Sequence, residues 1–128
     1  MRIILALFSI LICTVVVAED GLSVQFTIEE KVLGSHSVQS YTNSILMKFN
    51  ESAKFEFKNI YNVKFTSRTL EEKINLVVTL HDWIDGKPYY VGAKSIDIVV
   101  GSDFNFELEK YGRSYKLNID TSFGILPQ

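Results

Sequence analysis

Apolar and polar residues alternate strictly in one stretch of this chain after another, and this pattern constrains the fold more than any other feature. Successive side chains of a β-strand point to opposite faces, so strict alternation predicts half-buried strands. Apolar faces of this kind occur at residues 22–28, 55–57, 61–65, 74–80, 96–100, 104–108 and 115–119. No stretch shows a convincing helical period, and the pattern therefore predicts an all-β chain.

Turn-forming residues separate these stretches. Asp85-Gly86-Lys87-Pro88 lies between two long strands and predicts a hairpin, because glycine adopts positive φ without strain. Asn50-Glu51-Ser52, Gly101-Ser102-Asp103 and Tyr111-Gly112-Arg113 predict three further reversals. Short strands separated by turns in this way are typical of antiparallel sheets. We expect a mostly antiparallel β-sandwich or flattened barrel of about seven to nine strands.

Three segments leave alternatives open. Residues 66–73 could form one helical turn or a polar loop, and residues 31–44 could form a short edge strand or a mobile connection. The C-terminal residues 122–128 are apolar for a terminus, and we expect them to pack on the domain. The core is expected to contain the alternating apolar residues Val24, Phe26, Phe55, Phe57, Val63, Phe65, Leu76, Val78, Leu80, Ile96, Ile98, Phe104, Phe106, Leu117 and Ile119.

The first 18 residues have the pattern of a secretory signal peptide. Arg2 is followed by an apolar run from residue 3 to residue 17, and Val16-Val17-Ala18 offers a cleavage point. The run of about 15 residues is short of the ~20 that span a bilayer, although a retained anchor is an alternative. Lipidation of Cys13 is disfavoured because Ile12 precedes it. We expect one secreted or periplasmic β domain over residues 19–128.

Charge and cysteine content exclude several classes of function. The whole chain carries a formal net charge of −2, and loss of Arg2 with the signal would make it −3. A nucleic-acid-binding protein requires a strongly basic surface, so we expect no nucleic-acid partner. Cys13 is the only cysteine and would leave with the signal. The mature domain is then disulfide-free, without a cysteine nucleophile and without a membrane span.

The sequence offers no catalytic or metal-binding motif. His36 and His81 are far apart, and the neighbouring His81-Asp82 pair would point to opposite faces of a strand. The nucleophile motif G-x-S-x-G and the calcium-loop pattern of alternating acids are absent from the sequence. We expect no enzymatic activity, no metal and no cofactor. Asn50-Glu51-Ser52 is a glycosylation sequon whose use depends on the host.

The strongest candidate for binding is the tip of the hairpin around residue 85. Trp83, Lys87, Tyr89 and Tyr90 gather there, and aromatic side chains with polar surroundings are typical of binding hot spots. Alternatively, Trp83 and one tyrosine cover the end of the core. Edge strands offer a second route, because an open edge accepts a partner strand. Residues 31–44 are the first place to expect such an edge.

These observations favour a secreted, non-enzymatic module that binds another protein or a cell-surface component. One alternative is a small β-barrel that carries an apolar ligand, since eight-stranded barrels can enclose one. Another is a structural subunit of an envelope or extracellular assembly. No fixed residues of a known family are present, such as the Cys…Trp…Cys spacing of immunoglobulin domains.

Overall fold

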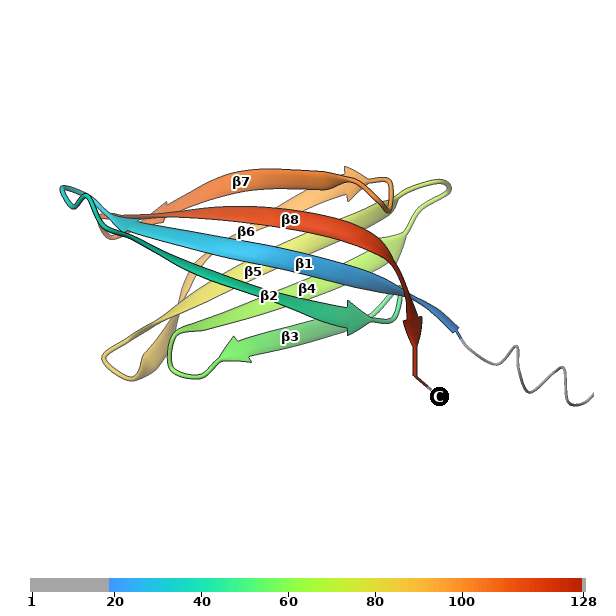
Figure 1. Cartoon of the computed structure of the whole chain (residues 1–128), viewed down its shortest axis with the longest axis horizontal. Coiled ribbons are helices and arrows are strands. Elements are labelled where there is room, and N and C mark those ends of the chain that lie inside the picture. The colour runs from blue at the N-terminus through green and yellow to red at the C-terminus, as the bar shows by residue number, and fades with distance from the viewer. Residues whose placement is uncertain (1–18, 128) are drawn as a thin grey trace, which may run out of the picture.

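The computed structural model describes residues 19–127, which form a sandwich of two four-stranded antiparallel sheets (Figure 1). The first sheet has the order β2 (Val38–Met47), β1 (Glu19–Val32), β8 (Arg113–Leu126) and β7 (Asp103–Lys110). The second has the order β3 (Ser52–Phe57), β4 (Tyr61–Thr69), β5 (Ile74–Ile84) and β6 (Lys87–Ile98). The all-β prediction is confirmed. The signal peptide predicted for residues 1–18 lies outside the described residues.

The strands run up and down in chain order, so the connections gather at two opposite ends (Figure 1). The β1–β2, β3–β4, β5–β6 and β7–β8 turns share one end, which we call the hairpin end. The β4–β5 loop and both crossovers between the sheets share the other, the terminal end. Residues 19 and 126 also lie there, because β1 and β8 pair along their whole lengths.

Two of the hairpins turn through only two residues. Asp85 and Gly86 link the paired residues Ile84 and Lys87, with φ of 54° and 77°. Tyr111 and Gly112 link β7 to β8 with φ of 46° and 74°. Positive φ at both central residues matches the right-handed twist of the flanking strands. The reversals predicted at residues 85–88 and 111–113 are confirmed.

The core fills the space between the sheets with side chains. Phe26 lies at its centre, with its ring 5.6, 6.1 and 5.1 Å from the rings of Phe55, Phe57 and Phe65. Every predicted core residue belongs to this cluster or packs against it. The prediction omitted several core residues, which are Leu22, Ile28, Met47, Tyr61, Ile74, Val91 and Tyr115. Most of them lie near strand ends, where alternation alone does not show whether the opposite sheet still covers the chain.

Buried hydroxyl groups hold both crossovers at the terminal end. The Ser67 hydroxyl accepts a hydrogen bond from the Asn50 backbone N–H at 3.1 Å, in the β2–β3 crossover. The Thr121 hydroxyl donates to the Ser102 carbonyl at 2.7 Å, in the β6–β7 crossover. Asn50 also has a φ of 63°, and its side-chain oxygen accepts hydrogen bonds from the Thr69 backbone N–H and hydroxyl. These bonds satisfy polar groups that the irregular backbone would otherwise leave unpaired.

The structure decides between the alternatives left open by the sequence. The expected loop or helical turn at residues 66–73 is β-strand to Thr69, followed by a loop. Residues 38–47 form the edge strand β2, which pairs with β1 alone. The C-terminal segment continues β8 to Leu126, opposite Glu19. The prediction that this segment packs on the domain is confirmed.

Candidate functional site

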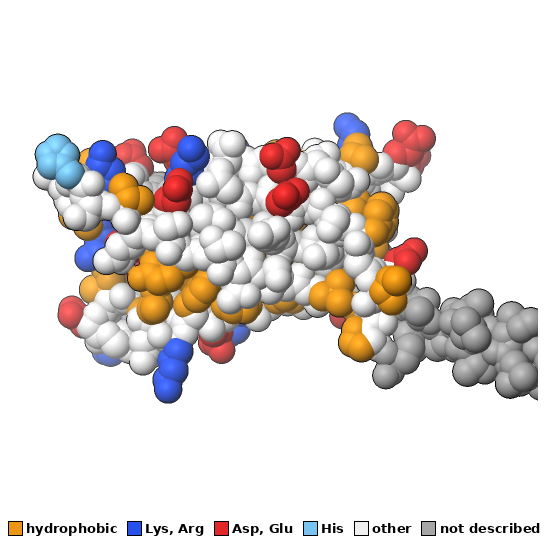
Figure 2. Space-filling view, viewed as in Figure 1, with side chains coloured by type: hydrophobic (Ala, Val, Ile, Leu, Met, Phe, Trp, Pro, Cys, Tyr) orange, Lys and Arg blue, Asp and Glu red, His pale blue; other side chains and the backbone are white. Residues whose placement is uncertain are grey.

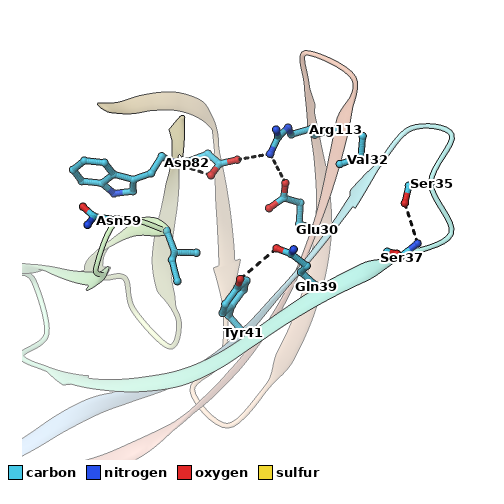
Figure 3. A pocket seen from close by; sticks show the side chains of 11 residues that line it. Glu30, Val32, Ser35, Ser37, Gln39, Tyr41, Asn59, Asp82 and Arg113 are labelled. Atoms are coloured by element: carbon cyan, nitrogen blue, oxygen red, sulfur yellow. Dashed lines mark hydrogen bonds and ion pairs between the residues drawn. The ribbon is translucent and has the colours of Figure 1, made fainter. Parts of the chain in front are cut away.

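A pocket of about 490 Å³ opens at the hairpin end, between the first sheet and the turns of the second (Figure 3). The first sheet and its β1–β2 loop contribute Glu30, Ser35, Ser37, Gln39, Tyr41 and Arg113. The second sheet contributes Asn59, Ile60, Asp82 and Trp83. Small-molecule sites commonly have volumes of about 300–1,000 Å³, so the pocket is large enough for a ligand.

Charged side chains form the inner wall of the pocket. Arg113 donates a hydrogen bond to Glu30 at 2.7 Å, and the same nitrogen lies 3.8 Å from an Asp82 oxygen. Figure 3 shows the guanidinium between the two carboxylates. The side chains of Glu30 and Asp82 are 10% and 5% exposed, whereas the Arg113 side chain is 36% exposed. Arg113 is therefore the most exposed of these three charged side chains.

Two tyrosines complete these contacts in a reciprocal arrangement. Tyr61 of the second sheet donates to Glu30 of the first. Tyr115 of the first sheet donates to Asp82 of the second at 2.5 Å. The two tyrosine rings meet edge to face at 6.4 Å. Glu30, Tyr61, Asp82, Arg113 and Tyr115, which we call the inter-sheet network, therefore join the two sheets with polar contacts at the hairpin end.

Burial shifts the proton affinities of this network. It raises the pKa of Asp82 above its ordinary value, with a further rise from the Glu30 charge, and the Tyr115 hydrogen bond opposes this change. Burial, followed by hydrogen bonds to the carboxylates, raises the pKa of Tyr61 and Tyr115. The hydrogen bond to Glu30 raises the pKa of Arg113. Both tyrosines therefore stay protonated as donors, and Arg113 stays charged.

The structure divides the predicted hairpin site between two surfaces. Trp83 lines the pocket and donates from its indole nitrogen to Asn62 at 3.2 Å. It also lines a second depression of about 290 Å³ beside Asn62. Tyr90 is half exposed on the outer face of the second sheet, with its ring 5.6 Å from that of His81. Trp83 and Tyr90 are therefore accessible, but only Trp83 borders the pocket.

The other two predicted residues lie elsewhere. Lys87 is exposed beside the β5–β6 turn. Tyr89 faces the interior opposite Asp82, and its ring is 5.8 Å from that of Tyr111. Its hydroxyl is buried near Tyr115 but forms no hydrogen bond of good geometry with a described residue. Lys87 and Tyr89 thus flank the hairpin end without lining the pocket.

The charged members of the pocket were not predicted from the sequence, although the alternation carried a signal for them. Glu30 continues the inward-facing positions of residues 22–28, and Asp82 continues those of residues 74–80. Arg113 precedes the inward positions of residues 115–119 in the same register. A charged side chain at an inward position must either pair with another charged or polar group or lie at the edge of the core, where water reaches it. All three occur at the hairpin end.

Exposed apolar side chains also gather at both ends, with acidic and basic groups interspersed between them (Figure 2). Val32, Leu33, Val38 and Tyr111 are between 45% and 78% exposed at the hairpin end. At the terminal end, Phe123 and Ile125 are 66% and 68% exposed. A shallower depression of about 330 Å³ lies beside Phe123. Both ends therefore offer apolar surface, but only the hairpin end joins it to a pocket with buried charges.

Metal-ligating residues do not gather within residues 19–127: no three His, Cys, Asp or Glu side chains there lie close enough to hold an ion. His36 is exposed in the β1–β2 loop, while His81 lies on β5. The part of the chain that the structure describes contains no helix long and apolar enough to cross a membrane.

Comparisons with known proteins give no relative. No family model matches the chain. No curated protein and no solved structure is significantly similar to it.

Proposed function

We propose that the protein is an exported, non-enzymatic module that binds another protein or a cell-surface component through its hairpin end. One observation carries the proposal: this end combines the pocket with accessible aromatic and apolar side chains. Trp83 borders the pocket, and Tyr111 and Tyr90 are 78% and 51% exposed. Aromatic side chains beside polar groups supply much of the affinity of protein interfaces.

The proposal that the protein is exported rests only on the signal-peptide pattern of residues 1–18. The non-enzymatic character rests on the sequence, which offers no catalytic motif. In the structure both pocket carboxylates are engaged within the chain. Glu30 accepts from the Tyr61 and Arg113 side chains, and Asp82 accepts from the Tyr115 side chain and the Trp83 backbone N–H.

The packed interior favours the binding module over the apolar carrier. An apolar carrier requires an empty interior, whereas side chains such as Phe26 and Phe65 fill the space between the sheets.

The proposal is tested by measuring affinity for a purified partner. The full chain is produced in a secreting host, immobilised and exposed to extracellular extract, and the retained component is purified. We expect Trp83→Ala and Tyr90→Ala each to weaken its binding about tenfold, which corresponds to about 1.4 kcal/mol. Phe123→Ala is the matched control because it removes an exposed aromatic ring from the terminal end. Loss of affinity in Phe123→Ala alone would refute the proposed location.

A further inference from the structure

The free polar groups of the pocket point to the chemistry of its ligand. The Ser37 hydroxyl oxygen and the Asn59 carboxamide have no side-chain hydrogen-bond partner in the described chain. The Gln39 side-chain oxygen accepts from Tyr41 at 3.3 Å, which leaves the amide nitrogen of Gln39 free to donate. Together these groups can both donate and accept hydrogen bonds. Ser37, Gln39 and Asn59 are exposed and form the outer wall of the pocket, which Tyr41 and Trp83 also line.

Charged ligands fit the inner wall poorly. An anion that approaches Arg113 also meets the Glu30 and Asp82 carboxylates, which lie within 4 Å of the same guanidinium nitrogen. A cation finds the carboxylate oxygens already occupied. Those of Glu30 accept from Tyr61 and Arg113, and those of Asp82 accept from Tyr115 and the Trp83 backbone N–H.

An apolar ligand fits the outer wall equally poorly. It would cover the Ser37, Gln39 and Asn59 polar groups without replacing their hydrogen bonds to water. Each buried polar group left unpaired costs about 1–3 kcal/mol. A ligand with many hydroxyl groups avoids this loss, because each hydroxyl both donates and accepts.

We infer that the pocket at the hairpin end binds a neutral polyhydroxylated ligand, such as an uncharged sugar unit of a cell-surface glycan. Tyr41 and Trp83 supply flat faces for the apolar side of the ring, and Gln39, Ser37 and Asn59 bond its hydroxyls. The inter-sheet network holds the inner wall rigid. This inference deepens the proposed function and rests on it, because it names the chemistry of the component bound at that end.

The test uses neutral, charged and apolar probes and the intrinsic fluorescence of Trp83, which is the only tryptophan in the chain. The full chain, produced in a secreting host, is titrated with methyl glucoside, methyl galactoside, methyl mannoside and N-acetylglucosamine. Glucuronic acid tests an anionic ring, glucosamine a cationic ring, and decanol an apolar chain. We expect saturable fluorescence changes with at least one neutral sugar and no saturable change with the other three probes.

Two variants locate the binding. Gln39→Ala removes an exposed pocket residue and is expected to weaken sugar binding at least tenfold. Gln25→Ala removes an exposed glutamine on β1 outside the pocket and is expected to leave affinity unchanged. Thermal melting checks that both variants remain folded. No saturable neutral sugar, tighter binding of a charged or apolar probe, or equal affinity in Gln39→Ala would each overturn the inference.

The failure of this inference can be distinguished from failure of the proposed function. If Trp83→Ala and Tyr90→Ala still weaken binding to the purified partner while no sugar binds, the hairpin end is an interface and the sugar assignment is wrong. If neither variant changes partner affinity, the proposed location itself is wrong.

Discussion

Tyr115 donates a 2.5 Å hydrogen bond to Asp82 across the interface between the two sheets. The bond joins β8 to β5, and both residues are almost completely buried. Its counterpart runs in the opposite sense, from Tyr61 to Glu30. Each sheet thus presents one carboxylate and one phenol to the other.

Tyr115→Phe should destabilise the fold, because it removes the donor and leaves part of a buried carboxylate unpaired. We expect a loss of about 1–3 kcal/mol in the free energy of unfolding, measured by urea denaturation. Tyr89→Phe is the matched control. Its buried hydroxyl forms no hydrogen bond of good geometry with a described residue, so its removal should cost less than the removal of the Tyr115 hydroxyl. Equal losses in the two variants would contradict this assignment.

Asp82→Asn should reveal how protonation of the buried carboxyl group affects stability. The pKa of Asp82 is raised above its ordinary 3.8 in the folded protein, so the folded state binds this proton more tightly than the unfolded chain. The stabilisation that this proton provides is complete below pH 3.8. It is lost as the pH rises through the pKa that Asp82 has in the folded protein. Asparagine does not titrate, so the stability of Asp82→Asn relative to wild type should increase over that range. Melting temperatures measured between pH 3 and 8 check this, and a pH-independent difference would refute it.

Phe26→Ala should cost about 3–5 kcal/mol, because it removes a ring that contacts three other phenylalanines and leaves a cavity. Domains of this size have a total stability of about 5–15 kcal/mol, so the variant would be marginally folded. Phe123→Ala removes a ring that is 66% exposed and should cost much less. Calorimetry of both variants measures the difference, and similar melting temperatures would show that Phe26 is not central to the core.

Three substitutions at Asn50 separate backbone conformation from side-chain bonding. Asn50→Gly keeps the positive φ but loses the two bonds from Thr69, so we expect a loss of about 1 kcal/mol. Asn50→Ala loses the same bonds and adds about 1–2 kcal/mol of left-handed backbone strain. Asn50→Asp keeps a side-chain oxygen that accepts both bonds, and aspartate tolerates positive φ. The stability of this variant should therefore remain close to that of wild type. Urea denaturation gives the order, and Asn50→Ala as stable as Asn50→Gly would contradict the role of strain.

Strand positions and turns could be predicted from the sequence because both depend on neighbouring residues. Alternation placed the core of β1, β5 and β8, and the Asp85-Gly86 and Tyr111-Gly112 pairs placed two hairpins. The pairing of the first strand with the last, from Glu19 to Leu126, depends on how the whole chain closes. Alternation carries no information on that closure.

Only some of the residues that line the pocket could be predicted from the sequence. Trp83 was identified from composition, but its neighbours Arg113 and Gln39 come from distant strands. Glu30 and Asp82 were not predicted, although they occupy inward positions of the alternation, and nothing in either segment indicates that one guanidinium lies between them. That arrangement requires the relative positions of the two sheets.

The complete pairing of β1 with β8 also determines how the molecule is displayed. Both strands contain 14 residues, so residues 19 and 126 lie about 40 Å from the hairpin end. An attachment made through either residue, whether to a bead, a fusion protein or a surface, leaves the pocket at the end of the molecule farthest from that attachment. A ligand in solution then reaches the pocket without obstruction from whatever carries the protein.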